Sequence, residues 1–470
     1  MAGRYDLLIV GMGSGGMTAA EFGSSLGLKV GVAERGRVGG DCLWTGCVPS
    51  KALLASAKAA HTMRHADLYG IEPCEPRVDT ARVFARIRSV QQAIATSDDS
   101  PARFESELGV EILRGDARLT GSHSAKVGDE DIEARFILLC TGSRPVEPPI
   151  PGLPEAGFLT SETVWDIPRA PDSLVLIGGG PIAVEMAQAF ARLGVGVTVL
   201  QKGPGILPRD EPELVATLTA RLRSEGVDLR LGVEATRVVV EDGRKVVHGT
   251  EGGVERSWAA HEIILGAGRR PNIEGLGLEE LGIAVGRRGI ETDDRLRTSV
   301  DSVYAAGDVA GRYLFTHSAG YEAARAVRNM FFPGSSKGTY AVPWCTFTDP
   351  ELAHAGLTEA EARERHDSDD VEIHVQELSH SDRARAEGAE NGAIKLVTAK
   401  GKLVGAHILA LAAGELIHEL ALAIHQGLKL ADLADVIHVY PTLSSGVQQL
   451  AAQGAYEKAE RLKFLIRSGR

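Results

Sequence analysis

Two cysteines five positions apart, Cys42 and Cys47, have side chains and a spacing that suit thiol–disulfide chemistry. In an ideal helix such a pair would lie somewhat too far apart for a relaxed disulfide, and a strand would separate it further. An irregular turn is therefore required, and Gly46 supplies the backbone freedom for it. Pro49 fits the first turn of a following helix, whose N-terminus would stabilise a thiolate at Cys47. Two buried structural cysteines are the simpler alternative.

The composition predicts an ordinary globular protein of several domains. The chain has 470 residues, of which 44% are hydrophobic, so about three domains with sizeable cores are expected. Its net charge of −12 argues against nucleic-acid or anionic-membrane partners. The most apolar stretch, residues 405–424, contains acidic and histidine side chains, so no membrane span is expected. We expect a cytosolic protein, because five cysteines are too few for a secreted disulfide scaffold and no signal peptide precedes the first strand.

A strand–turn–helix pattern at the N-terminus predicts a dinucleotide site. A buried strand over 5–10 is followed by a helix over 17–26. The turn between them carries three glycines: Gly11, Gly13 and Gly16. These glycines allow a pyrophosphate to approach the backbone at the helix N-terminus. The next strand ends at Glu34, about 20 residues after the first glycine, where a carboxylate can accept hydrogen bonds from a ribose.

The same pattern recurs further along the chain. A strand over 174–177 leads into a turn with Gly178 and Gly180, and a helix over 184–193 follows. The next strand ends at Gln201, where an NAD site would place an acidic residue. Lys202 beside it suits a 2′-phosphate, so NADPH is favoured. If Lys202 is only a solvated surface lysine, NADH is used instead.

Connections between these patterns indicate the domain organisation. A proline-rich connection after Thr141 and Gly142 marks a boundary near residue 150. The segment 266–272, which contains Gly268, repeats this signal at the exit from the second nucleotide site. Strands and helices without a nucleotide motif follow residue 340 and predict an antiparallel α+β unit. The predicted domains are residues 1–150 and 269–339 together, 151–268, and 340–470.

The motifs and their order resemble the class I flavoprotein disulfide reductases, which include dihydrolipoamide dehydrogenase, glutathione reductase and mercuric reductase. Residues 42–51, Cys-x-x-x-x-Cys-Val-Pro-Ser-Lys, carry the most specific part of the resemblance, and its details are most similar to mercuric reductase. The resemblance implies an α/β fold with two Rossmann-like domains, for FAD and NAD(P)H, and a C-terminal α+β dimerisation domain. It also implies a homodimer with a shared active site and a redox disulfide, in which Cys47 faces the flavin and Cys42 meets the acceptor.

The resemblance assigns roles to further residues. Lys51 and Glu185 match an ion pair beside the flavin, and Asp308 matches a ligand of its ribityl chain. His317 is more often a cap or packing residue than a catalytic one. Other candidate cofactor contacts are Gly115, Thr141, Gly142 and Gly268. No resident metal ion is expected.

The C-terminal region departs from the disulfide-reducing members. Those enzymes carry a histidine and a glutamate as an acid–base dyad where this chain has Tyr440 and Ser445. A phenol titrates near pH 10 and is a poor general base at neutral pH. Mercuric reductase is similar in having a tyrosine there, which helps to hold a metal ion, but this chain lacks that enzyme's C-terminal cysteine pair.

These patterns predict an FAD-dependent NAD(P)H oxidoreductase that passes electrons through Cys42 and Cys47 to an acceptor. The acceptor is a metal ion, a quinone-like oxidant or an unusual disulfide. One alternative is a dihydrolipoamide dehydrogenase in which His438 is the base, since two residues along an extended segment it can share a face with Tyr440. Another is a flavin-bearing redox sensor with negligible turnover.

Overall fold

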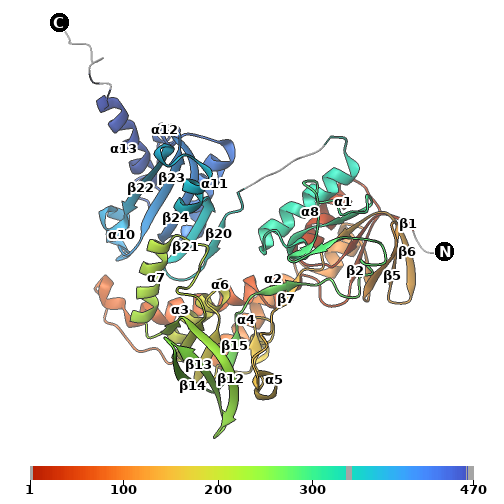
Figure 1. The fold of residues 1–470 in the computed structure, drawn as a ribbon, viewed down its shortest axis with the longest axis horizontal. Helices are drawn as coiled ribbons and strands as arrows, with labels where there is room; N and C mark the ends of the chain where they lie inside the picture. The colour runs from red at the N-terminus through yellow and green to blue at the C-terminus, as the bar shows by residue number, and fades with distance from the viewer. Residues whose placement is uncertain (1–3, 335–340, 462, 464–470) are drawn as a thin grey trace.

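The computed structural model describes residues 4–334, 341–461 and 463. Three sheets organise the chain, and Figure 1 shows the third of them, coloured cyan to blue, set apart from the first at the opposite side. The first two sheets have parallel strands at their centres, and β4 and β5 extend the first sheet in antiparallel pairing. The third sheet is antiparallel throughout. The predicted α/β class is therefore confirmed.

The first sheet contains the strand that begins the chain and the strand near residue 304. Its elements are β1 (Arg4–Val10), α1 (Ser14–Ser25), β2 (Val30–Glu34), β3 (Glu111–Arg114), β4 (Ala117–Gly121), β5 (Ser124–Val127), β6 (Glu130–Leu139), β19 (Val303–Ala305) and α8 (Thr316–Phe331). The strand order is β3-β2-β1-β6-β5-β4, and β19 pairs with β6. Strand β1 runs parallel to both β2 and β6, so Leu8 lies opposite Gly31 on one side and Ile137 on the other. Helices α1 and α8 lie side by side over this sheet (Figure 1).

The second sheet repeats this parallel arrangement. Its elements are β8 (Leu159–Thr160), β9 (Ser173–Ile177), α6 (Pro181–Arg192), β10 (Gly196–Gln201), α7 (Pro212–Ser224), β11 (Asp228–Leu231) and β15 (Glu262–Leu265). The order is β11-β10-β9-β15-β8. The run Leu174–Ile177 is buried throughout, as expected for a strand covered on both faces. An antiparallel sheet of β12 (Val233–Glu241), β13 (Arg244–Glu251) and β14 (Val254–Ala260) follows β11.

The third sheet is the antiparallel α+β unit expected after residue 340. Its strands, in the order β20-β21-β24-β23-β22, are β20 (Trp344–Thr346), β21 (Glu351–Gly356), β24 (Lys402–Ala410), β23 (Ala393–Ala399) and β22 (Val371–Glu377). The helices are α9 (Glu359–Arg365), α10 (Asp382–Ala386), α11 (Ala413–Gln426), α12 (Leu430–Ala434) and α13 (Ser445–Arg461). Every residue of β23 is buried, so this strand forms the centre of the unit's core.

The remaining elements connect the sheets. They are α2 (Gly40–Trp44), α3 (Cys47–Arg64), α4 (Thr80–Ala95), β7 (Ser143–Pro145), α5 (Leu153–Ala156), β16 (Arg269–Pro271), β17 (Val285–Gly286) and β18 (Gly289–Ile290). Helix α3 packs against both α4 and α6 and so joins the first nucleotide turn to the second. Within the part of the chain described here, no helix is long and apolar enough to cross a membrane.

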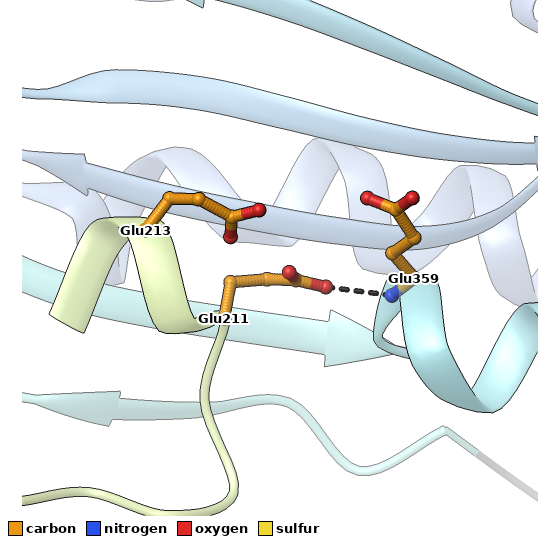
Figure 2. Close-up of side chains that lie close together, drawn as sticks. All are labelled: Glu211, Glu213 and Glu359. Atoms are coloured by element: carbon orange, nitrogen blue, oxygen red, sulfur yellow. Dashed lines mark hydrogen bonds between the residues drawn. The ribbon is translucent and has the colours of Figure 1, made fainter. Parts of the chain in front are cut away.

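A buried charge cluster joins the second and third sheets. Lys395 on β23 is only 5% exposed, and its ammonium nitrogen lies 2.7 Å from Glu211 and 2.9 Å from Glu359. A third carboxylate, that of Glu213, lies 3.3 Å away. Figure 2 shows these three carboxylates converging from the starts of α7 and α9. The lysine ammonium forms an ion pair with each of the three carboxylates, so the cluster acts as a structural tie between the two sheets.

Replacing Lys395 by Met should therefore destabilise this junction, because Glu211 would keep a buried charge without its cation. The expected loss is about 3–5 kcal/mol of folding free energy, seen as a lower midpoint of urea unfolding. Lys400→Met is the control, because the Lys400 side chain is 73% exposed in its pair with Asp370. Its effect should stay within about 0.5 kcal/mol. Equal midpoints for the two variants would contradict a structural role for the cluster.

Candidate active site

The two cysteines lie on consecutive helices that meet at a glycine. Cys42 is in the short helix α2, and Cys47 is the first residue of α3. Gly46 between them is non-helical, with φ −124° and ψ −104°, which confirms the expected irregular turn. A Cβ at this position would lie 3.0 Å from the carbonyl oxygen of Asp41. The short helix α2 was not expected from the sequence.

The thiols of Cys42 and Cys47 are free and close enough to share a hydrogen bond. This shared hydrogen bond, the Thr316 hydroxyl and the charge of Lys51 outweigh burial and lower the pKa of Cys47 below its usual range. The Thr316 Oγ1 atom lies 3.2 Å from the Cys47 sulfur. The hydrogen bond to Cys47 and burial raise the pKa of Cys42. These pKa shifts favour the thiolate at Cys47 and the protonated thiol at Cys42.

The carboxylate of Glu185 connects helix α3, which carries Cys47, to helix α6 and to the segment just after β20. Glu185 on α6 accepts a hydrogen bond from Lys51 Nζ at 2.9 Å and another from the backbone N–H of Phe347 at 2.9 Å. The Lys51 ammonium also lies 4.2 Å from the centre of the Phe347 ring. The structure thus brings together the predicted Lys51–Glu185 pair and adds a residue just after β20 that the sequence had not indicated.

The first glycine turn is shaped for close approach of a ligand. A Cβ on Gly16 would lie 1.9 Å from the carbonyl oxygen of Gly11, so only glycine fits there. Helix α2, which carries Cys42, packs directly on this turn, since a Cβ on Gly40 would lie 2.7 Å from the Cα of Gly13. Glu34 accepts the backbone N–H of Met12 at 2.6 Å and therefore lies at the end of the turn. The thiols and the first nucleotide turn are consequently neighbours.

Asp308 lies close to the same region, in a charged network. Its carboxylate accepts a hydrogen bond from Ser143 Oγ at 2.5 Å, and Arg269 Nε lies 3.8 Å away. Burial raises the pKa of Asp308. Arg269 also pairs with Asp41, the neighbour of Cys42 in the sequence. A half-buried carboxylate at this place fits the hydroxyl-rich chain of a flavin cofactor.

Three predicted cofactor contacts, Thr141, Gly142 and Gly268, lie in the connections between the first two sheets, and a fourth, Gly115, lies between β3 and β4 of the first sheet. Thr141 Oγ1 donates to the carbonyl of Asn272 at 2.6 Å, and the Asn272 backbone N–H donates to the carbonyl of Gly142 at 3.0 Å. Gly268 accepts from the backbone of Val146. Gly115 has a positive φ of 141° and donates its N–H to the carbonyl of Glu34 at 3.2 Å.

The second glycine turn has the features expected of a pyridine-nucleotide site. A Cβ on Gly178 would lie 2.3 Å from the carbonyl oxygen of Gly266, while space around Gly180 at the start of α6 is open. The Gln201 side chain packs against this turn and donates to the Gly205 carbonyl at 3.1 Å. Lys202 forms an exposed ion pair of 2.6 Å with Glu234. The Lys202 ammonium is therefore already paired with the Glu234 carboxylate.

Tyr440 and His438 have different environments. Tyr440 is 67% exposed, and its hydroxyl donates to Asp382 Oδ2 at 2.7 Å. The His438 side chain is only 6% exposed, and its Nε2 lies 2.7 Å from Glu419 on α11. The structure thus differs from the expectation that both side chains share a face, because Glu419 draws the imidazole inward. Ser445 begins α13 and donates its hydroxyl to the Thr442 carbonyl.

His317 has the surroundings of a packing residue. Its ring stacks on Phe315 with centres 5.3 Å apart, and Nε2 lies 2.7 Å from the carbonyl oxygen of Pro343. Burial lowers its pKa, which favours the neutral ring. Its neighbour Thr316, which the sequence did not single out, is the residue that contacts a redox thiol.

Several residues of the site carried no local signal in the sequence. Thr316 lies 269 positions from the cysteine it contacts, and Asp382 lies 58 positions from Tyr440. Arg269 is part of the Gly-Ala-Gly-Arg-Arg-Pro segment noted as a domain exit, but nothing in it pointed to Asp41. These contacts exist only because distant elements pack together.

Comparison with known proteins shows the family to which the chain belongs. Residues 5–323 match the sequence model described as pyridine nucleotide-disulphide oxidoreductase, and residues 342–451 match the dimerisation domain of the same family. This chain is a pyridine nucleotide-disulphide oxidoreductase. The expected resemblance and enzyme class are confirmed. Membership implies FAD and a pyridine nucleotide as cofactors, and the dimerisation domain supports a homodimer.

Several characterised relatives of this oxidoreductase are similar over most of its length. A dihydrolipoyl dehydrogenase of Thermus scotoductus is 36% identical over 403 residues, covering 84% of each chain. A mercuric reductase of Bacillus cereus is 33% identical over 395 residues, covering 84% of this chain and 62% of that one. The solved Cu(II) complex of the HOCl-induced flavoprotein disulfide reductase RclA from Escherichia coli superposes with a TM-score of 0.84 at 27% identity. That match covers 96% of this chain and 99% of RclA.

The contact between Thr316 and Cys47 yields a testable pKa change. Thr316→Val removes a donor that favours the thiolate, so the pKa of Cys47 should rise by about one pH unit. The thiolate of the reduced protein, followed by its ultraviolet absorbance, should then appear only at higher pH. Thr62→Val is the control, because this exposed threonine lies on α3, the helix of Cys47, and donates its hydroxyl to the Lys58 carbonyl. An unchanged titration in Thr316→Val would show that the hydroxyl does not act on the thiol.

Proposed function

We propose that the enzyme moves electrons from NAD(P)H through FAD to the Cys42–Cys47 disulfide and from there to an acceptor held near Tyr440 of the other subunit. The position of Cys47 at the start of α3, with Thr316 Oγ1 at 3.2 Å and the Lys51–Glu185 ion pair on the same helix, is the observation that carries this proposal. A thiolate is the form of cysteine that exchanges electrons and bonds with acceptors. A reducing compartment such as the cytosol suits a pair that cycles.

The residues around the first glycine turn suit FAD. Gly11, Gly13 and Gly16 would accept its pyrophosphate, Glu34 its ribose, and Asp308 its ribityl hydroxyls. When bound, FAD supplies a hydride acceptor that links the nucleotide to the disulfide. Lys51 would orient the flavin ring.

After reduction of the disulfide, the two sulfurs have different tasks. Cys47 keeps the negative charge, because Thr316 and Lys51 favour its thiolate. Cys42 keeps the proton and would be the sulfur that meets the acceptor.

The surroundings of Tyr440 favour an acceptor other than an ordinary disulfide. The hydrogen bond and charge of Asp382 raise the pKa of Tyr440, so the phenol is an even weaker base at neutral pH. The mercuric reductase relatives and the solved Cu(II) complex of RclA support a metal ion as acceptor. A quinone-like oxidant also requires no basic side chain at position 440 and is the alternative acceptor within this proposal.

Dihydrolipoamide is the second candidate substrate, and it is favoured by the dihydrolipoyl dehydrogenase relatives. It would require His438 as the base. The imidazole is engaged by Glu419 and by the Val436 carbonyl within its own chain, so it would have to leave both to reach a thiol. Steady oxidation of NAD(P)H with a metal ion, a quinone or lipoamide, the oxidised form of dihydrolipoamide, would exclude a role as a redox sensor without turnover.

Anaerobic titration with NAD(P)H tests the redox pair. The holoenzyme should take up more electrons than its FAD alone requires, because the Cys42–Cys47 disulfide is reduced as well. A long-wavelength absorption band from thiolate and flavin should appear and be lost in Cys47→Ser. Cys74→Ser, a change at an exposed cysteine outside the site, should leave it intact. Uptake of only the electrons needed by FAD would refute the proposal.

NADPH should be preferred over NADH, because Lys202 can bind a 2′-phosphate. Lys202→Glu should raise KM for NADPH at least about tenfold, since a charge-assisted contact is lost and a repulsive one is added. KM for NADH should change little. Glu234→Gln, which frees the same ammonium, should lower KM for NADPH. Equal effects on both nucleotides would contradict this assignment.

Tyr440 should serve the acceptor half-reaction alone. Tyr440→Phe should slow metal or quinone reduction roughly tenfold through loss of its hydroxyl, while stopped-flow reduction of the flavin by NADPH stays unchanged. Tyr440→His combined with Ser445→Glu should increase the weak reduction of lipoamide and glutathione disulfide, because it supplies a base. If Tyr440→Phe matches the wild type with every acceptor, the tyrosine is only a packing residue.

A further inference from the structure

A row of four side chains crosses one face of the third sheet. Trp344, His354, His407 and Lys395 lie on four neighbouring strands, and each is the cross-strand partner of the next. Partners that lie directly opposite each other project from the same face of a sheet. The rings of Trp344 and His354 stack with centres 3.5 Å apart, and the two histidines and the lysine are at most 4% exposed. This face is therefore covered by another part of the protein.

Residues 209–211, which precede α7, cover this row. The Arg209 guanidinium lies 4.5 Å from the centre of the Trp344 ring, and the indole Nε1 donates to Asp210 Oδ1 at 2.8 Å. Glu211 contacts the far end of the row through its ion pair of 2.7 Å with Lys395. Figure 1 shows α7 next to the strands of this sheet. The connection that leads from β10 into α7 is therefore docked along the row from one end to the other.

The two buried histidines support the indole ring of Trp344. Nε2 of His354 lies 2.9 Å from the Gly356 carbonyl oxygen, and Nε2 of His407 lies 3.0 Å from that of Leu357. A carbonyl oxygen can only accept, so each Nε2 carries a hydrogen. Burial lowers the pKa of both imidazoles, so at pH 7 they are neutral rings that pack behind the indole. The orientation of the indole N–H is therefore fixed by buried neighbours.

The same connection is attached to the second glycine turn. The backbone N–H of Leu207 donates to the carbonyl of Gly179 in that turn at 2.9 Å, and the Leu207 side chain is buried. Leu207 has a positive φ of 47°, which is unfavourable for a bulky side chain and persists only where the surroundings hold it. Only Pro208 separates Leu207 from Arg209. The contact with the glycine turn and the docking on Trp344 therefore act on one short stretch of chain.

We propose that Trp344, a residue of the dimerisation domain, is a positioning residue of the pyridine-nucleotide site. Its indole holds residues 207–211, and through Leu207 these residues hold the glycine turn in the shape that receives the pyrophosphate of the nucleotide. This inference rests on the proposed function, which assigns that turn to NAD(P)H. Because the pyrophosphate is common to NADPH and NADH, loss of the indole N–H should weaken the binding of both nucleotides alike. Lys202→Glu, in contrast, should weaken the binding of NADPH alone.

Trp344→Phe in the holoenzyme tests this role, because it keeps an aromatic ring beside His354 but leaves Asp210 without the indole donor. KM for NADPH and KM for NADH should each rise roughly fivefold, which is the effect of one hydrogen bond. The value of kcat, and KM for menadione as the acceptor, should change little. Thr348→Val is the matched control, since it removes a buried hydrogen bond to the Pro350 carbonyl within the dimerisation domain. It should leave KM for both nucleotides unchanged.

Asp210→Ala removes the same hydrogen bond from its other end and should raise both KM values by a similar factor. The double variant of Trp344→Phe and Asp210→Ala should be no worse than either single variant, because the two changes act through one bond. Independent structural effects of the two residues would instead add. Calorimetric titration of the oxidised holoenzyme with NADP⁺ gives a readout that does not depend on turnover. The Kd for NADP⁺ should rise by the same factor in all three variants.

Unchanged nucleotide affinity in Trp344→Phe, additive effects in the double variant, or an equal rise in KM for menadione would overturn the inference. A lower midpoint of urea unfolding without a change in Kd would overturn it as well. Lys202→Glu, titrated with NADP⁺ in the same way, separates this failure from that of the proposed function. If Lys202→Glu weakens NADP⁺ binding and Trp344→Phe does not, only the inference fails. If neither variant weakens it, the assignment of the second turn to the pyridine nucleotide fails too.

Discussion

The buried carboxylate of Glu185 is the interaction on which the arrangement of the active site depends. One oxygen accepts from Lys51 on the redox helix, and the other accepts from the backbone of Phe347 next to the third sheet. The carboxylate itself belongs to α6 of the second sheet. Because a buried charge is tolerated only when it is paired and hydrogen-bonded, these three elements must meet at this point. Their meeting sets the position of α3 and therefore of Cys47.

A second buried charge network strengthens the same junction. Arg192 at the end of α6 pairs with Glu225 at 2.7 Å and with Asp349 beside β21 at 2.8 Å, and both contacts lie largely out of solvent. The cluster around Lys395 ties α7 to the third sheet in the same way. The second sheet is thus attached to the unit that carries Tyr440 by charges rather than by apolar contacts alone. Such pairs specify orientation, since a displaced element would leave a buried charge without its partner.

The two halves of the proposed reaction involve residues with different electrostatic surroundings. Near the flavin site, Lys51 and Thr316 favour a thiolate at Cys47. In the dimerisation domain, Asp382 accepts the phenol proton of Tyr440 in a hydrogen bond and raises the pKa of the phenol. The first environment suits a sulfur that exchanges electrons, and the second leaves the phenol a weak base. Tyr440, which stands where the disulfide-reducing enzymes carry a histidine, therefore fits the proposed metal or quinone acceptor.

The sequence by itself determined the elements whose causes are local. Glycine turns after buried strands, the spacing of Cys42 and Cys47, and the antiparallel C-terminal unit were all predictable, because backbone sterics and hydrophobic periodicity act over a few residues. The pairing of Lys51 with Glu185 was expected only through family resemblance. Tertiary structure alone decided that Thr316 contacts Cys47, that Asp382 holds Tyr440 and that Glu419 turns His438 inward. Hydrogen bonds between residues far apart in the chain depend on how whole elements pack, and no local pattern encodes that packing.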